Sequence, residues 1–138
     1  MLRGLATVSF FADDMTAAKA WYTELLELEP YFAVPNADAP AYLEWRFGDI
    51  ECELGIIDSR FAPHTVSDKP AGAVVFWHVD DLEGAVERLL SLGATLNDPI
   101  TERGDSGFRT ASVVDPFGNI LGVMNNPHYL EILAKLNA

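Results

Sequence analysis

Acidic side chains at alternate positions are the first residues in this sequence that could do chemistry. Glu51 and Glu53 are separated by one residue, so on an extended strand both point to the same face. Two neighbouring carboxylates could divide the roles of general acid and general base between them. The same spacing is also typical of the solvated edge of a sheet, and the sequence leaves both interpretations open.

A second candidate is His78, the only histidine within a regular apolar strand pattern. A histidine near carboxylates can titrate near neutrality and act as a general base. A lone histidine at a strand end more often makes a structural hydrogen bond, and we expect that role here. If the protein is catalytic, Glu53 and His78 are the candidate residues. His64 and His128 stand beside prolines and are expected at the surface.

Further polar and aromatic side chains should share a face with these candidates. In the segment that begins at Tyr42, the apolar Leu43 and Trp45 alternate with polar residues, which is typical of a strand with one buried face. Alternation predicts a ligand-binding face made of Thr7, Ser9, Phe11, Tyr42, Glu44, Arg46, Glu53, Phe76 and His78. Aromatic walls with a few charged groups suit a small organic molecule.

The elements that would position these residues occur twice. Segments 8–18 and 75–85 match at a constant offset of 67 residues. Each copy runs from an apolar strand through an Asp-Asp pair into a helical pattern, with Asp14 and Asp81 placed as helix N-caps. Strand-like segments and a hairpin turn follow each helix. The pattern predicts an α+β fold of two β-α-β-β-β modules that form a cupped mixed sheet.

The expected hairpins pair strands 42–47 with 50–57, and 108–114 with 119–124. In the strand 50–57, alternation directs Ile50, Cys52 and Leu54 toward the helix. The same alternation directs Glu51 and Glu53 into the cup.

Length and composition set limits on the protein class. With 138 residues, 49% of them hydrophobic, the chain should form one globular domain. We divide it into a first module at 1–62, a linker at 63–72, a second module at 73–126 and a C-terminal helix at 127–138. The net charge of -12 disfavours nucleic acid and anionic membranes as partners. The single cysteine, Cys52, cannot form an internal disulfide, and we expect a cytoplasmic protein.

The sequence resembles the vicinal oxygen chelate superfamily, which groups glyoxalase I, bleomycin-resistance proteins and extradiol dioxygenases. The resemblance lies in the strands followed by Asp13-Asp14-Met15 and by Val79-Asp80-Asp81-Leu82, and in the turn Asp115-Pro116-Phe117-Gly118-Asn119. It implies paired modules, a ligand in the sheet concavity and commonly a homodimer. It does not fix the reaction, because this fold serves lyases, dioxygenases, transferases and proteins that only sequester a drug.

The resemblance also implies a divalent metal held by His or Glu side chains, one from each of four strands. In this sequence three of those positions fall on Thr7, Val74 and Gly122, and Glu53 is the best match for the fourth. A metal site in a protein needs about three protein ligands. We therefore expect no metal cofactor at the usual place.

Three functions remain open at this point. The favoured one is a glyoxalase/bleomycin-resistance-like protein that binds a small organic molecule in the sheet concavity without the usual metal. The alternative is a divalent-metal-dependent enzyme of lyase or dioxygenase type with a remodelled ligand set. The third is a dimerisation or regulatory module whose concavity is filled by its own side chains.

Overall fold

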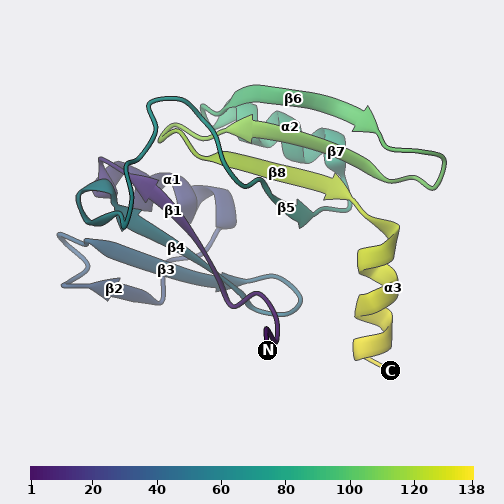
Figure 1. Cartoon of the computed structure of the whole chain (residues 1–138), viewed down its shortest axis with the longest axis horizontal. Helices are drawn as coiled ribbons and strands as arrows, with labels where there is room; N and C mark the ends of the chain where they lie inside the picture. The colour runs from purple at the N-terminus through teal and green to yellow at the C-terminus, as the bar shows by residue number, and fades with distance from the viewer. The chain divides into compact units, whose positions relative to one another are not determined.

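The structure is a computed structural model that describes all 138 residues. The chain divides into two compact units, Met1–Lys69 and Pro70–Ala138, and each is described by itself. Both units contain a strand, a helix and three further strands in that order (Figure 1). The chain therefore has the predicted α+β architecture of two β-α-β-β-β modules.

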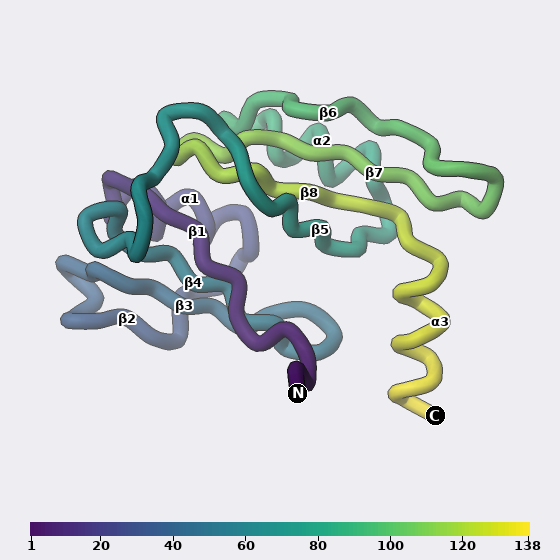
Figure 2. The backbone as a smooth tube through the Cα atoms, viewed as in Figure 1, coloured from purple at the N-terminus to yellow at the C-terminus, as the bar shows by residue number.

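The first unit contains one four-stranded mixed sheet in the order β1-β4-β3-β2. β1 runs parallel to β4, and the other two pairs are antiparallel. Figure 2 shows β1 at one edge and β2 at the opposite edge of this sheet. The elements are β1 (Thr7–Ala12), α1 (Met15–Leu26), β2 (Phe32–Val34), β3 (Tyr42–Phe47), β4 (Cys52–Asp58) and the 3-10 helix η1 (Ser59–Phe61).

The second unit repeats this arrangement with the strand order β5-β8-β7-β6. β5 runs parallel to β8, while β6, β7 and β8 pair in antiparallel fashion. The elements are β5 (Val75–His78), α2 (Leu82–Ser91), β6 (Thr95–Glu102), β7 (Arg109–Val114), β8 (Ile120–Asn125) and α3 (Pro127–Leu136).

None of the helices in either unit has the length and apolar character needed to cross a membrane.

The offset of 67 residues persists in the strand pairing. Val8 lies opposite Leu54 in the first unit, and Val75 lies opposite Leu121 in the second. The repeat detected in the sequence is therefore a repeat of sheet register as well as of element order.

Both main helices begin at the predicted caps. The Asp14 carboxylate accepts a hydrogen bond from the Ala17 amide, and the Asp81 carboxylate accepts one from the Gly84 amide, each at 2.9 Å. A cap of this kind satisfies an amide that has no partner within the first helical turn.

The apolar core of each unit lies between its helix and one face of its sheet. In the first unit Tyr22, Leu43, Trp45 and Ile56 are completely buried. The Trp45 indole donates a hydrogen bond to the Leu28 carbonyl oxygen at 2.9 Å, so its one polar atom is satisfied. The expectation that Trp45 fills the core is confirmed.

The predicted start of the strand at residue 50 is wrong. β4 begins at Cys52, because residues 48–51 form a turn in which the Glu51 amide donates to the Gly48 carbonyl oxygen at 3.2 Å. Ile50 and Cys52 are exposed rather than packed under α1, and Glu51 has a φ of 52° within the turn. Glu51 and Glu53 therefore do not form a strand pair.

Replacing Asp14 by alanine should lower the free energy of unfolding by about 1 kcal/mol, because α1 loses the acceptor for its Ala17 amide. Urea denaturation followed by circular dichroism measures this change. Asp13→Ala removes an exposed neighbouring carboxylate with the same change in net charge, and its effect should stay within about 0.5 kcal/mol. Equal losses in the two variants would contradict the capping role.

Candidate ligand-binding face

The face of the first sheet that points away from α1 carries most of the predicted site residues. We call it the open face. Residues directly opposite each other on neighbouring strands share a face, so the register defines three rows across this sheet. The rows are Thr7, Glu53 and Arg46; Ser9, Gly55, Glu44 and Phe32; and Phe11, Ile57, Tyr42 and Val34. Seven of the nine predicted residues lie in them.

Glu53 is the centre of the first row. Its Oε2 accepts a hydrogen bond from the Thr7 hydroxyl at 2.7 Å, and its Oε1 accepts from Arg46 Nε and Nη2 at 3.1 and 3.0 Å. The Thr7 hydrogen bond, followed by those from Arg46, lowers the pKa of Glu53 below its ordinary value. A carboxylate held in its charged form is a weak general base, and the contacts give Glu53 an anchoring role.

Glu44, in the next row, has a different environment. The Tyr42 phenol donates a hydrogen bond to Glu44 Oε1 at 2.6 Å. Burial, and then the nearby negative charge of Glu53, raises the pKa of Glu44, and Arg46 opposes this shift. The same two causes raise the pKa of Tyr42. Tyr42 therefore remains a hydrogen-bond donor at neutral pH.

The Tyr42 ring lies against Gly55, which has no side chain to keep the ring away. A Cβ at Gly55 would lie 2.6 Å from the phenol oxygen and 2.8 Å from Cε2 of that ring. The glycine thus permits the close approach that places the phenol beside Glu44.

Phe76 and His78, the remaining two predicted residues, belong to the second unit. Phe76 lies opposite Gly122 on the neighbouring strand, and a Cβ at Gly122 would lie 2.5 Å from ring atom Cδ1. Each unit therefore has an aromatic ring over a glycine, and the two glycines are separated by the repeat offset of 67 residues. The ring comes from β3 in the first unit and from β5 in the second.

His78 connects β5 to the C-terminal helix. Its Nδ1 accepts a hydrogen bond from the Asn126 amide at 3.0 Å, and its ring stacks on Tyr129 with centroids 4.9 Å apart. The Nε2 atom is buried without a hydrogen-bond partner and lies 3.5 Å from Asp80 Oδ1. These contacts favour the structural role over that of a general base.

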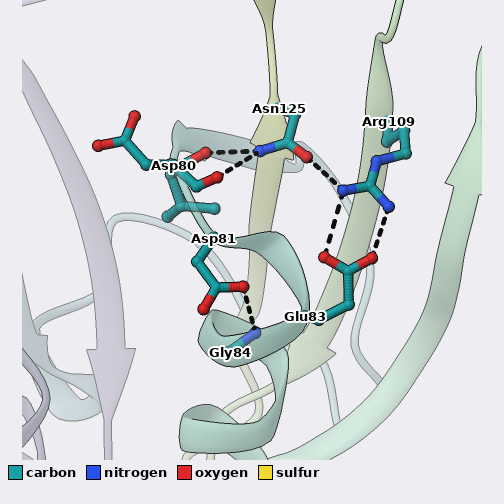
Figure 3. Close-up of polar contacts among 7 residues, drawn as sticks. Asp80, Asp81, Glu83, Gly84, Arg109 and Asn125 are labelled. Carbon is teal, nitrogen blue, oxygen red and sulfur yellow. Dashed lines mark hydrogen bonds and ion pairs between the residues drawn. The ribbon is translucent and has the colours of Figure 1, made fainter.

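Arg109 is engaged by its own unit (Figure 3). Its guanidinium makes two hydrogen bonds to the Glu83 carboxylate at 2.6 and 3.2 Å, and a third to Asn125 Oδ1 at 2.7 Å. Asn125 Nδ2 in turn donates to the Val79 carbonyl oxygen at 2.7 Å. The network ties β7 and β8 to the start of α2. Because Arg109 is bonded to Glu83 and Asn125, its role is structural and it is not an open site for an anion.

The donors at the four positions implied by the family resemblance do not fit a divalent metal. The register shows that Gly55 is the equivalent of Gly122, so the assignment of Glu53 to the fourth position is wrong. Thr7, Val74 and the two glycines offer one neutral hydroxyl, whereas a metal needs about three ligands. Neither unit brings three His, Cys, Asp or Glu side chains together in a geometry that could hold an ion.

Two aromatic residues that contact the polar side chains of the open face were missed by the sequence reasoning. Tyr31 lies under the Arg46 guanidinium, whose carbon is 4.3 Å from the ring centroid. Phe32 lies opposite Glu44 and packs edge-on against Tyr42 at 6.3 Å between centroids. β2 has only three residues, too few to show alternation, but two adjacent aromatic residues at its start, Tyr31 and Phe32, were an available signal.

Comparisons with known proteins agree with this architecture. The model of the Glyoxalase/Bleomycin resistance protein/Dioxygenase superfamily matches residues 4–123. A search of curated proteins gives no match.

Several solved structures have the same fold. A glyoxalase-related enzyme from Fulvimarina pelagi is 20% identical, with a TM-score of 0.69 over 91% of this chain and 90% of that chain. A glyoxalase/bleomycin resistance protein from Catenulispora acidiphila is 24% identical, with a TM-score of 0.59 over 90% and 100%. A mutant of the fosfomycin resistance protein FosX from Listeria monocytogenes, complexed with Mn(II) and 1S,2S-dihydroxypropylphosphonic acid, is 11% identical, with a TM-score of 0.70 over 93% and 94%. At these identities the likeness establishes the fold alone.

Replacing Thr7 by valine should raise the pKa of Glu53, because the largest cause of its lowered value is the Thr7 hydroxyl. Carbon-13 NMR of the side-chain carboxyls against pH measures the shift. In the unsubstituted protein Glu53 should titrate below Glu44, whose pKa is raised. The stability linked to Glu53 is present above its unfolded pKa of about 4.3 and is lost as the pH falls through the lower folded value. The reverse order of titration would contradict these assignments.

Gly55→Ala should lower the free energy of unfolding by about 1–3 kcal/mol, because its Cβ would collide with Tyr42. In a Tyr42→Ala background the loss should be much smaller, as a double-mutant cycle measures. Gly122→Ala provides the comparison. Phe76→Ala should restore only part of the stability lost in Gly122→Ala, because the Val75 carbonyl oxygen also lies 2.8 Å from a Cβ at position 122. The same loss at Gly55 in both backgrounds would refute the Tyr42 contact.

Proposed function

Because the chain belongs to the Glyoxalase/Bleomycin resistance protein/Dioxygenase superfamily, we propose that it binds a small organic molecule on the open face of the first sheet. We propose further that binding needs no divalent metal at the position usual for the family. The observation that carries the proposal is the Tyr42–Glu44 pair, held beside the anchored Glu53–Arg46 pair among aromatic side chains.

The chemistry of the open face supports ligand binding. Phe11, Phe32, Val34 and Ile57 supply apolar contact area around Glu44. Binding sites for small molecules typically combine mostly apolar walls with a few polar groups that are already oriented. The hydrogen bonds of Glu53 and of Tyr42 fix such groups before a ligand arrives, which reduces the entropy lost on binding.

The residues at the usual metal positions support the metal-free part of the proposal. The two glycine positions are covered by the rings of Tyr42 and Phe76. Glu53, which lies opposite Thr7, already uses both carboxylate oxygens in hydrogen bonds to Thr7 and Arg46. A metal at Glu53 would have to displace both partners.

The expected cellular setting follows from charge and from the family. We propose a homodimer, as the family resemblance implies, and a cytoplasmic location, as the single cysteine suggests. The net charge of -12 supports a protein without nucleic-acid partners.

The test begins with protein purified without chelator and analysed for bound metals. We expect metal well below one equivalent. A thermal-shift screen with aromatic metabolites and cationic drugs should then yield at least one saturable ligand, with stabilisation of about 2.7 kcal/mol at 100 times its Kd. Treatment with EDTA should leave that stabilisation unchanged, and amide shifts in an NMR titration should map to β1, β3 and β4.

Tyr42→Ala should weaken this ligand, whereas Glu51→Ala, which changes an exposed turn residue, should not. Stoichiometric zinc, nickel, iron or manganese that is lost in Glu53→Ala would refute the metal-free proposal. The absence of any saturable ligand would refute binding on the open face.

A further inference from the structure

The open face already holds one cation, which belongs to the protein itself. The Arg46 guanidinium lies 4.3 Å above the Tyr31 ring centroid and makes hydrogen bonds to Glu53 at 3.0 and 3.1 Å. An aromatic face and a carboxylate attract a cation together, because the ring quadrupole and the charge act in the same direction. We call this set the Arg46 cradle.

A second set that also combines a carboxylate with aromatic rings lies beside it. Glu44 is flanked by Phe32, directly opposite on β2, and by Tyr42, whose phenol donates to Glu44 at 2.6 Å. The Phe32 and Tyr42 rings meet edge-on with centroids 6.3 Å apart. This Glu44 cradle contains a carboxylate and two aromatic rings, as the first contains a carboxylate and one ring. Its only side-chain hydrogen-bond donor is a neutral phenol.

The charges around Glu44 leave it incompletely neutralised. Among the charged neighbours, Glu53 raises its pKa more than Arg46 lowers it, so repulsion from the carboxylate exceeds attraction by the guanidinium. Arg46 is already paired with Glu53. A positive charge beside Glu44 would remove this imbalance. The protein as a whole, with a net charge of -12, attracts cations over longer distances as well.

We infer that the Glu44 cradle binds the positively charged nitrogen of an organic cation, with the apolar part of the ligand against Phe32 and Tyr42. This inference rests on the proposed function and names the ligand class for the same face. Phe32 is 46% exposed, so a ligand can reach its ring without displacing the core. The cation would take the place relative to Glu44 that Arg46 takes relative to Glu53.

The test compares three probes that share a benzyl or phenyl group and differ in charge. Benzyltrimethylammonium, benzyl alcohol and benzoate are titrated into the full chain at low salt, and amide shifts on β2 and β3 give the Kd. Benzyltrimethylammonium should bind most tightly and benzoate least. In Glu44→Gln, where the amide oxygen can still accept from Tyr42, the ammonium should bind about tenfold more weakly while benzyl alcohol changes little.

Glu51→Gln is the matched control, because it removes the same charge from an exposed turn of the same unit. It should leave the ammonium Kd within about twofold, as a distant surface charge does in screened solution. Phe32→Leu removes the ring and retains apolar area, and should weaken the ammonium more than benzyl alcohol.

Equal affinity for the ammonium and the alcohol at this face would overturn the cation inference and leave the proposed function intact. Equal weakening by Glu44→Gln and Glu51→Gln would also overturn it, because the effect would then be one of net charge. If none of the probes shifts the open face, the cation inference fails, and the ligand screen decides the proposed function separately.

Discussion

The register of β3 against β4 determines what the open face of the first sheet carries. Trp45 lies opposite Leu54 and Leu43 opposite Ile56, and all four side chains are buried under α1. Sliding β3 by one residue would move these side chains to solvent, which makes the register costly to change. The same register places Arg46 opposite Glu53 and Glu44 opposite Gly55. The polar contacts of the open face are therefore a consequence of how the core packs.

Within this register, two glycines determine where aromatic rings can lie on the sheets. Gly55 and Gly122 occupy equivalent positions in the two units, and each is covered by an aromatic ring. Tyr42 reaches its glycine from the neighbouring antiparallel strand, whereas Phe76 reaches Gly122 from the parallel one. Only Tyr42 brings a hydroxyl. The duplicated architecture thus presents a polar aromatic residue in one unit and an apolar one in the other.

Much of this arrangement could be predicted from the sequence because it depends on local periodicity. Alternation along the segment from Tyr42 separated the buried Leu43 and Trp45 from the open-face residues, and the repeated Asp-Asp pairs marked both helix caps. The start of β4 was missed because Ile50 is apolar and Glu51 adopts a positive φ that its residue type does not signal. The turn between the two strands was predicted, but propensity and alternation do not indicate that it extends through Glu51.

Contacts between distant segments were harder to predict. The position of His78 depends on Asn126 and Tyr129, about 50 residues further along the chain, and no pattern around His78 indicates them. The partnership of Phe32 with Glu44 likewise arises from a three-residue strand that is too short to show a period. Such pairings follow from tertiary packing, which overrides local preference.

The two carboxylates of the open face show how neighbouring residues of one type acquire different chemistry. Glu53 accepts three hydrogen bonds, two of them from a guanidinium, and its pKa is lowered. Glu44 accepts one from a phenol, is more buried, and has a raised pKa because burial and Glu53 both disfavour its charge. The hydrogen bonds from Thr7 and Arg46 hold Glu53 in its charged form, and this negative charge contributes to the raised pKa of Glu44. Arg46 is paired with Glu53 and lies over Tyr31, so it does not fully neutralise Glu44. The carboxylate of Glu44 is therefore the charged group of the open face that is available to a ligand.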